Sequence, residues 1–145
     1  MSKVATRFAP SPTGPLHIGG VRTALFNWLF SQNKSGTFRL RIEDTDKERS
    51  KSIFSEDIFI SMKWLGINWD QDVIYQSKNI LYHIDLAQRL LKEGKAYKCY
   101  CTKEEIEEAR NNAKKEKKPY KYNRKWRDFK GVINKPYVIR IKIPL

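Results

Sequence analysis

The sequence predicts an α/β protein built on a parallel β-sheet. Strand-like and helix-like segments alternate along the 145 residues, which is the pattern of strands joined by crossover helices. A loop rich in proline and glycine separates the first strand from the first helix. Strongly basic sequence follows residue 91, so we expect a second part of the chain with a different role.

Hydrophobic spacing predicts the elements in order. A short apolar stretch over 4–8 predicts the first strand, and the prolines and glycines of 10–15 then exclude regular structure. The spacing of an amphipathic helix follows, at Val21, Ala24, Leu25, Trp28 and Leu29. We expect strands at 3–9, 37–43, 95–100 and 137–143, helices at 17–33, 51–65, 78–93 and 103–117, and an irregular basic stretch over 118–135.

Residues that begin and end helices support these bounds. Gly36 separates the first helix from the second strand, and Gly66 is suited to the left-handed position after the next helix. Gly94 ends the helix over 78–93. Thr102 and Glu105 form a Thr-x-x-Glu capping box, which predicts a helix start. The helix over 78–93 has one apolar face, formed by Ile80, Ile84, Ala87 and Leu91.

The start of the first helix has the chemistry of a phosphate site. It reads His17-Ile18-Gly19-Gly20, and a helix N-terminus offers unpaired N–H groups and partial positive charge. The two glycines would let a phosphate approach the backbone, and the imidazole adds a donor. A loop of this kind can also be a simple connection, and a lone histidine can be structural. The four residues alone therefore leave nucleotide binding open.

The longer string settles the interpretation. Residues 7–29 closely resemble the opening of bacterial glutamyl-tRNA synthetases, which are class I aminoacyl-tRNA synthetases with a His-x-Gly-Gly form of their signature. Residues 38–50, with Ile-Glu-Asp-Thr-Asp at 42–46, resemble the family's second strand and acidic turn. Residues 96–105 resemble the start of its tRNA acceptor-end domain. The resemblance covers the whole chain in the family's order and identifies an N-terminal fragment.

The resemblance implies a site, residue by residue. Glutamate would be bound by Arg7, Ser11 and Glu43, with the Arg7 guanidinium forked onto a carboxylate and Glu43 holding the ammonium. For Glu43, Asp44 and Asp46 the alternative is an acidic turn that caps the next helix, and we favour it for Asp46. The expected ATP-binding residues are Pro12, Thr13, Gly14, His17, Gly19 and Gly20, the last three being the expected catalytic residues.

The implied activity is that of a glutamate–tRNA ligase. Glutamate would attack the α-phosphate of ATP, with Mg²⁺ accompanying the nucleotide, and the glutamyl-adenylate would be transferred to the 3′ end of a glutamate-accepting tRNA. The fold would be the first half of a class I Rossmann-like sheet over 1–94, followed over 95–145 by the start of an inserted acceptor-end-binding α+β domain. We expect the fragment to be inactive alone, without the second catalytic half and the anticodon-binding part, and the full-length protein to be monomeric.

Composition agrees with a tRNA partner. Residues 1–91 hold 12 Lys and Arg against 9 Asp and Glu, whereas residues 92–145 hold 17 against 7, so most of the net charge of +13 lies in the second part. Aromatic residues among those cations suit an unpaired RNA end, although a lysine-rich surface alone would look similar. No leader peptide, membrane span or disulfide pattern is present, so we expect a cytoplasmic protein.

Cys99 and Cys101 raise the question of zinc, because many relatives bind it here with two further ligands downstream. A structural zinc needs four ligands, and this chain has no third cysteine. We expect zinc to be absent, no metal-binding residues, and Trp126 to pack in the metal's place.

Other functions remain as alternatives. A glutamyl-queuosine-type paralogue shares the His-x-Gly opening, but residues 45–50 fit the true synthetase better, and glutaminyl enzymes differ at the acidic turn. A small-molecule nucleotidyltransferase would not need the basic segment over 92–145. A basic RNA-binding module would not need Arg7, Ser11, His17 and Glu43 together.

Overall fold

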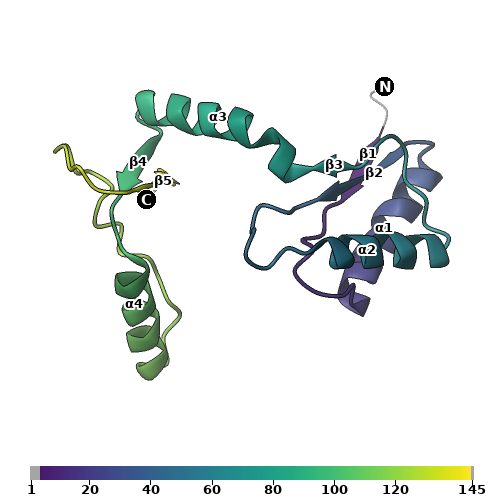
Figure 1. Cartoon of the computed structure of the whole chain (residues 1–145), viewed down its shortest axis with the longest axis horizontal. Helices are drawn as coiled ribbons and strands as arrows, with labels where there is room; N and C mark the ends of the chain where they lie inside the picture. The colour runs from purple at the N-terminus through teal and green to yellow at the C-terminus, as the bar shows by residue number, and fades with distance from the viewer. Residues whose placement is uncertain (1–3, 145) are drawn as a thin grey trace. The chain divides into compact units, whose positions relative to one another are not determined.

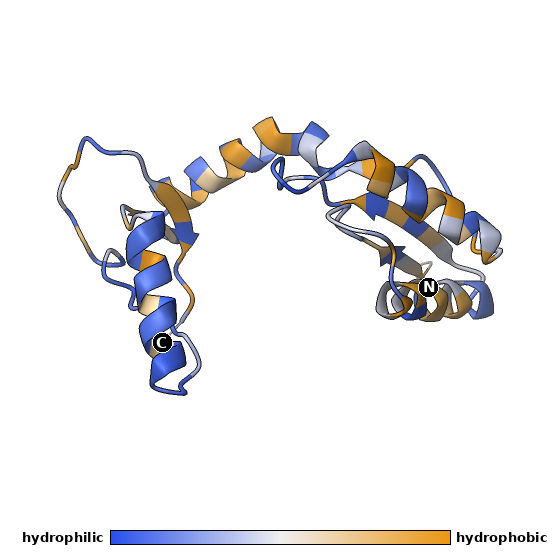
Figure 2. Cartoon of the chain, turned by 60° about the horizontal axis from the view of Figure 1, so that its bottom comes forward, coloured by the Kyte–Doolittle hydropathy of each residue, from blue (hydrophilic) through white to orange (hydrophobic). Residues whose placement is uncertain are grey.

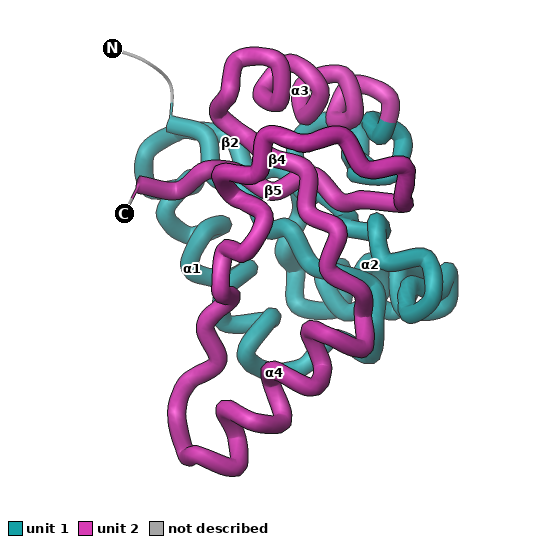
Figure 3. The backbone as a smooth tube through the Cα atoms, turned by 90° about the vertical axis from the view of Figure 1, so that its left-hand side faces the viewer, with its two compact units in different colours: residues 1–80 teal, residues 81–145 magenta. Residues whose placement is uncertain are grey.

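The computed structural model describes residues 4–144, and these separate into unit 1, which ends at Ile80, and unit 2, which begins at Leu81 (Figure 3). This division concerns packing within each unit. The functional domain boundary expected after residue 94 stays a prediction.

Unit 1 is a parallel sheet with crossover helices, as the alternation of elements predicts. The strand order is β1-β2-β3, and both pairings are parallel. The third strand was not predicted, because two residues are too few to form a pattern. The elements are β1 (Ala5–Phe8), α1 (Ile18–Asn33), β2 (Thr37–Ile42), α2 (Ser52–Trp64), β3 (Ile74–Tyr75) and the 3₁₀ helix η1 (Gln76–Asn79) (Figure 1).

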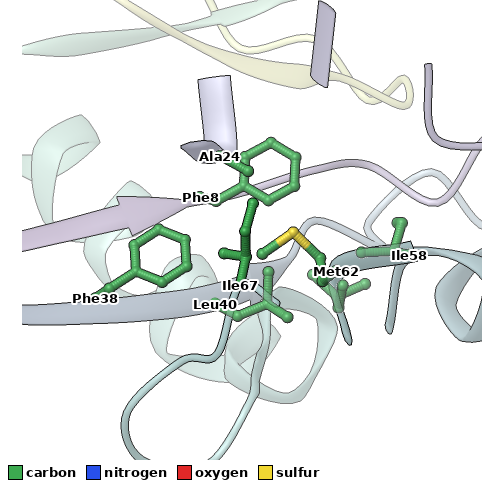
Figure 4. Packing of buried hydrophobic residues seen from close by; sticks show 8 residues of the cluster. Phe8, Ala24, Phe38, Leu40, Ile58, Met62 and Ile67 are labelled. Carbon is green, nitrogen blue, oxygen red and sulfur yellow. The ribbon is translucent and has the colours of Figure 1, made fainter. Parts of the chain in front are cut away.

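Both long helices of unit 1 cover the same face of its sheet. Along β2, Phe38, Leu40 and Ile42 are buried and alternate with arginines. Ala24 of α1 packs into the same core, which therefore lies between the two helices and one face of the sheet. The rest of this cluster consists of Phe8, Ile58, Met62 and Ile67 (Figure 4). We call the opposite side of the sheet, where Arg39 and Arg41 lie, the free face.

Glycine ends two helices as the sequence predicts. Gly66 has a φ of +70°, its N–H bonds to the carbonyl of Lys63, and the N–H of Ile67 bonds to the carbonyl of Met62. These two bonds form a Schellman motif, which satisfies the last carbonyls of α2. Gly94, with a φ of +69°, ends α3 with the same pair of bonds.

The loop over 9–17 is held by three hydrogen bonds from other parts of unit 1. Two of them use proline carbonyls, and the third uses a side chain of α2. The bonds run from the Glu43 N–H to the Pro10 carbonyl at 2.9 Å, from the Lys51 N–H to the Pro12 carbonyl at 3.1 Å, and from the Leu16 N–H to the Asp57 carboxylate at 2.9 Å. The loop therefore takes its shape from the end of β2 and from α2.

Unit 2 combines two helices with an antiparallel pair of strands. Its elements are α3 (Ile80–Lys92), whose first residue still belongs to unit 1, then β4 (Ala96–Cys99), α4 (Lys103–Lys115) and β5 (Val138–Ile141). The helix expected over 78–93 therefore begins after η1. The predicted capping box is confirmed, because Thr102 and Glu105 exchange both bonds at the start of α4. Figure 2 shows α4 as largely hydrophilic. Among residues 4–144, no helix has the length and apolar character needed to cross a bilayer.

Asp44 joins the end of β2 to the start of η1. Its carboxylate accepts hydrogen bonds from the Ser77 N–H at 2.8 Å and from the Ser77 hydroxyl at 2.6 Å. Burial raises the pKa of Asp44, but the bonds from Ser77 outweigh it, so the pKa lies below its ordinary value of 3.8.

The Asp57 anchor can be tested by removing its carboxylate. Asp57→Ala should lower the free energy of unfolding by about 1.5–3 kcal/mol, because the half-buried Leu16 N–H loses a charged acceptor. Urea unfolding followed by tryptophan fluorescence would measure the change. The exposed neighbour Glu56 provides the control, since Glu56→Ala should change stability by less than about 0.5 kcal/mol. Equal effects of the two variants would contradict the anchor.

The Asp44–Ser77 pair predicts acid sensitivity. Because the folded-state pKa is lowered, the ionised carboxylate contributes stability above its ordinary pKa of 3.8, and this contribution is lost as the pH falls through the folded value. Asp44→Asn should therefore lower the free energy of unfolding at neutral pH. Below about pH 4, the free energy of unfolding should fall less steeply for this variant than for the wild type. Asp72→Asn, at an exposed position, should keep the wild-type pH profile. Parallel profiles for Asp44→Asn and wild type would contradict the assignment.

Candidate functional site

His17 begins α1 as its N-cap residue. The backbone is extended there, and the Nδ1 atom accepts the Gly19 N–H at 3.2 Å. Because Nδ1 is an acceptor, the proton of the neutral imidazole lies on Nε2, where it can be donated to a ligand. The imidazole is exposed, so this donor is accessible.

The two glycines after His17 meet a steric requirement. A Cβ atom at Gly19 would lie 2.9 Å from Cε1 of the His17 ring, and one at Gly20 would lie 2.8 Å from Cδ1 of Leu16. Either contact is too close for a real Cβ, so the ring or the leucine would have to move. Gly19 therefore leaves the imidazole in its place, and Gly20 leaves room for the Leu16 side chain.

Four of the predicted site residues line one pocket beside the helix start. It has a volume of about 160 Å³ and includes Ser11, Gly14, His17 and Gly20. Its remaining walls are mainly apolar and come from Phe8, Pro10, Pro15, Leu16 and Ile58. A pocket with an imidazole donor, a hydroxyl and a helix N-terminus can accept a small anionic group such as a phosphate.

The other predicted residues lie outside this pocket. Arg7 is exposed on the free face, in register with Arg39 of the neighbouring strand. Thr13 closes a turn by donating its N–H to the Ser11 carbonyl at 2.9 Å. Pro12 is buried and lines a different pocket. Glu43 follows β2, and its carboxylate forms an ion pair with Arg41.

A second pocket of unit 1 was not predicted from the sequence. It has a volume of about 580 Å³ and lies where the acidic turn meets the start of α2 and η1. Asp44, Lys47, Lys51 and Ser77 are among its lining residues. The clustering of charged residues over 43–51 was the available signal, but the sequence could not indicate that η1 would complete the wall.

Asp46 caps a turn rather than a helix, which corrects the expectation for this residue. Its carboxylate accepts bonds from the Arg49 backbone at 3.2 Å and from the Arg49 Nε at 2.7 Å. These bonds lower the pKa of Asp46. The N-cap residue of α2 is Lys51, which makes no side-chain capping bond, so the first N–H groups of α2 receive no help from Asp46.

The two cysteines of unit 2 share a tyrosine hydroxyl. The Tyr122 oxygen lies 2.9 Å from the Cys99 sulfur and 3.4 Å from the Cys101 sulfur, and the Arg140 guanidinium lies 4.1 Å from the centre of the tyrosine ring. The expectation that Trp126 packs at this place is wrong, because Tyr122 occupies it. Within residues 4–144, no three His, Cys, Asp or Glu side chains are grouped to hold a metal.

The hydrogen bonds among Cys99, Cys101, Tyr122 and Arg140 shift the pKa values of this cluster. Burial raises the pKa of the Cys99 thiol, but the Tyr122 hydroxyl and the Arg140 guanidinium outweigh it and hold the pKa below its ordinary value of 9.0. Burial and the neighbouring sulfurs raise the pKa of Tyr122 well above its ordinary value of 10.0. The phenol therefore keeps its proton, and either the phenol or a thiol can be the donor in these contacts.

Unit 2 also gathers cations and aromatic rings around its strands. Trp126 packs edge-to-face on Tyr100 and on Phe129, with ring centres 5.1 and 5.2 Å apart. The same unit has a pocket of about 500 Å³ whose polar lining is cationic or aromatic. Those lining residues are Tyr97, Lys121, Tyr122, Arg124, Arg127 and Arg140. Such a surface is suited to a nucleic-acid backbone and unpaired bases.

Comparison with known proteins places these features in one family. Residues 3–145 match the family model described as tRNA synthetases class I (E and Q), catalytic domain. The chain is 61% identical over 149 residues to the glutamate–tRNA ligase of Pelagibacter ubique and 55% identical over 142 residues to that of Thermodesulfovibrio yellowstonii. These alignments cover 100% and 98% of this chain, but 32% and 30% of the two relatives.

A solved structure agrees with the sequence comparison. The crystal structure of a glutamate tRNA ligase from Elizabethkingia meningosepticum, in complex with its amino acid, matches with a TM-score of 0.82 and 35% identity. The match covers 99% of this chain and 33% of that one, so the chain spans about a third of the length of its relatives. The predicted α/β fold and the predicted resemblance are confirmed. The chain belongs to the class I tRNA synthetase family for glutamate and glutamine and carries part of that family's catalytic domain.

Proposed function

We propose that this chain is the nucleotide- and glutamate-binding part of a glutamate–tRNA ligase. The observation that carries the proposal is the pocket at the start of α1, where Ser11, Gly14, His17 and Gly20 lie together. The names of the relatives support the choice of glutamate. We assign residues 1–94 to the catalytic domain and residues 95–145 to the start of the acceptor-end-binding domain, in a cytoplasmic protein that is monomeric at full length.

In the proposed reaction, an oxygen of the glutamate α-carboxylate forms a bond to the α-phosphorus of ATP. The bond from that phosphorus to the bridging oxygen breaks, and pyrophosphate leaves with its Mg²⁺. His17 Nε2 and the N–H groups at the start of α1 stabilise the negative charge on the phosphates, which is electrostatic catalysis. Pro12, Thr13, Gly14, Gly19 and Gly20 shape the phosphate site.

The amino acid would lie beside the carboxyl ends of β1 and β2. Arg7 binds a substrate carboxylate through two parallel bonds, Ser11 adds a hydroxyl, and Glu43 accepts the ammonium. The second step transfers the glutamyl group to the 3′ end of a glutamate-accepting tRNA. The basic and aromatic surface of unit 2 is the proposed tRNA contact in this chain.

The phosphate assignment is tested in the protein at the full length of its relatives. His17→Ala should slow tRNA-dependent ATP–pyrophosphate exchange by about 10²–10³, the effect of losing one transition-state donor. His17→Asn separates two roles, because asparagine caps a helix well but lacks the imidazole donor. The His17→Asn variant should fold like the wild type, but its ATP–pyrophosphate exchange should be as slow as that of His17→Ala. His83→Ala removes the other histidine and should leave exchange unchanged. Normal exchange by His17→Ala would refute the assignment.

Zinc is proposed to be absent, since Tyr122 already satisfies both sulfurs. Elemental analysis of the purified protein should give well under one zinc per chain. Tyr122→Cys would supply a third thiolate near Cys99 and Cys101, and this variant should retain more zinc after dialysis than the wild type. Stoichiometric zinc in the wild-type protein would show that the cluster binds metal.

A further inference from the structure

Arg41 lies beside Glu43 on the free face of the sheet. It belongs to the middle strand and is in register with Ile74 of β3. The alternation of β2 sends Leu40 and Ile42 into the core and Arg41 to the opposite side. Neither helix of unit 1 packs its core residues on that side, so Arg41 has no role in the hydrophobic core.

The Arg41 guanidinium holds one oxygen of the Glu43 carboxylate. Nη2 of Arg41 donates to Oε1 of Glu43, and the two side chains are 26% and 32% exposed, so the pair is partly shielded from solvent. The Glu43 backbone is fixed as well, since its N–H bonds to the Pro10 carbonyl. Both the main chain and the side chain of Glu43 are therefore held next to the loop over 9–17.

This arrangement is a poor one for stability alone. The Nε atom of Arg41 is buried and has no hydrogen-bond partner among the described residues. A buried donor without a partner costs more free energy than a partly exposed ion pair contributes. A lysine would neutralise Glu43 without burying an unpaired donor. What the arginine adds is a fixed direction, because the N–H groups of its planar guanidinium point in fixed directions, whereas a lysine ammonium rotates freely.

We propose that Arg41 is a positioning residue of the glutamate site. By occupying Oε1, it turns the carboxylate so that Oε2 is left to accept the ammonium of the amino acid. A carboxylate has acceptor sites on both oxygens, so the two cations share Glu43 without competing for the same lone pairs. The inference rests on the proposed function, in which Glu43 binds the ammonium, and adds the residue that orients it.

The test uses the protein at the full length of its relatives and measures tRNA-dependent ATP–pyrophosphate exchange. Arg41→Met keeps the aliphatic stem and removes the guanidinium. It should raise KM for glutamate about tenfold, within the usual range for coupled partners, while KM for ATP changes by less than about twofold. Arg41→Lys keeps the charge but loses the planar guanidinium, and its KM for glutamate should lie between those of the wild type and Arg41→Met. Arg39→Met is the matched control on the same face and should resemble wild type.

A double-mutant cycle decides between positioning and general damage. In a Glu43→Gln background, Arg41→Met should cause no further rise in KM for glutamate, because the carboxylate that it orients is gone. An equal rise in both backgrounds, or equal effects on glutamate and ATP, would overturn the inference. If Arg41→Met fails to fold, Arg41→Lys decides alone, and a wild-type KM for glutamate refutes positioning. A wild-type protein without glutamate-dependent exchange would instead refute the proposed function.

Discussion

The site depends on how a proline-rich loop is held. Prolines have no N–H, so the loop over 9–17 cannot organise itself through donors at Pro10, Pro12 and Pro15. Its shape is set from outside, by two N–H groups that reach proline carbonyls and by one carboxylate that receives a loop N–H. The position of His17, and with it the start of α1, follows from these three bonds.

The end of β2 connects the two halves of the candidate site. The N–H of Glu43 holds the phosphate-side loop, and its carboxylate lies on the free face with Arg41. One residue thus links the place proposed for ATP with the place proposed for the amino acid. This is consistent with a parallel sheet, in which the carboxyl ends of neighbouring strands meet at one edge and ligands bind there.

Local features were predictable from the sequence, and distant ones were not. The ends of helices at Gly66 and Gly94 and the capping box at Thr102 depend on bonds between residues a few positions apart, so their signals lie in short strings. The bond from Leu16 to Asp57 joins residues 41 positions apart, and the Cys99–Tyr122 contact joins residues 23 apart. No short string records such pairs, which is why Asp57 was missed and Trp126 was chosen wrongly.

Hydrophobic spacing predicts which residues of a helix share a face, but it does not show whether another element covers that face. Leu25 and Leu29 fit the helical pattern of α1, yet they are 39% and 49% exposed, while Ala24 is fully buried. The candidate site was predictable as far as Ser11, Gly14, His17 and Gly20, which the structure brings into one pocket. The contact between Arg41 and Glu43 could not be predicted, because it depends on which face of the sheet each side chain of β2 occupies.

The Leu16–Asp57 bond has a consequence for motion. An amide proton exchanges with solvent only when its hydrogen bond opens, so exchange at Leu16 requires that α2 release its carboxylate. The acceptor belongs to a helix that contributes Ile58 and Met62 to the core, so the loop is anchored to a packed element. A loop without such an anchor moves in nanoseconds to microseconds, and the bond to Asp57 restricts that motion at the place where phosphate is proposed to bind.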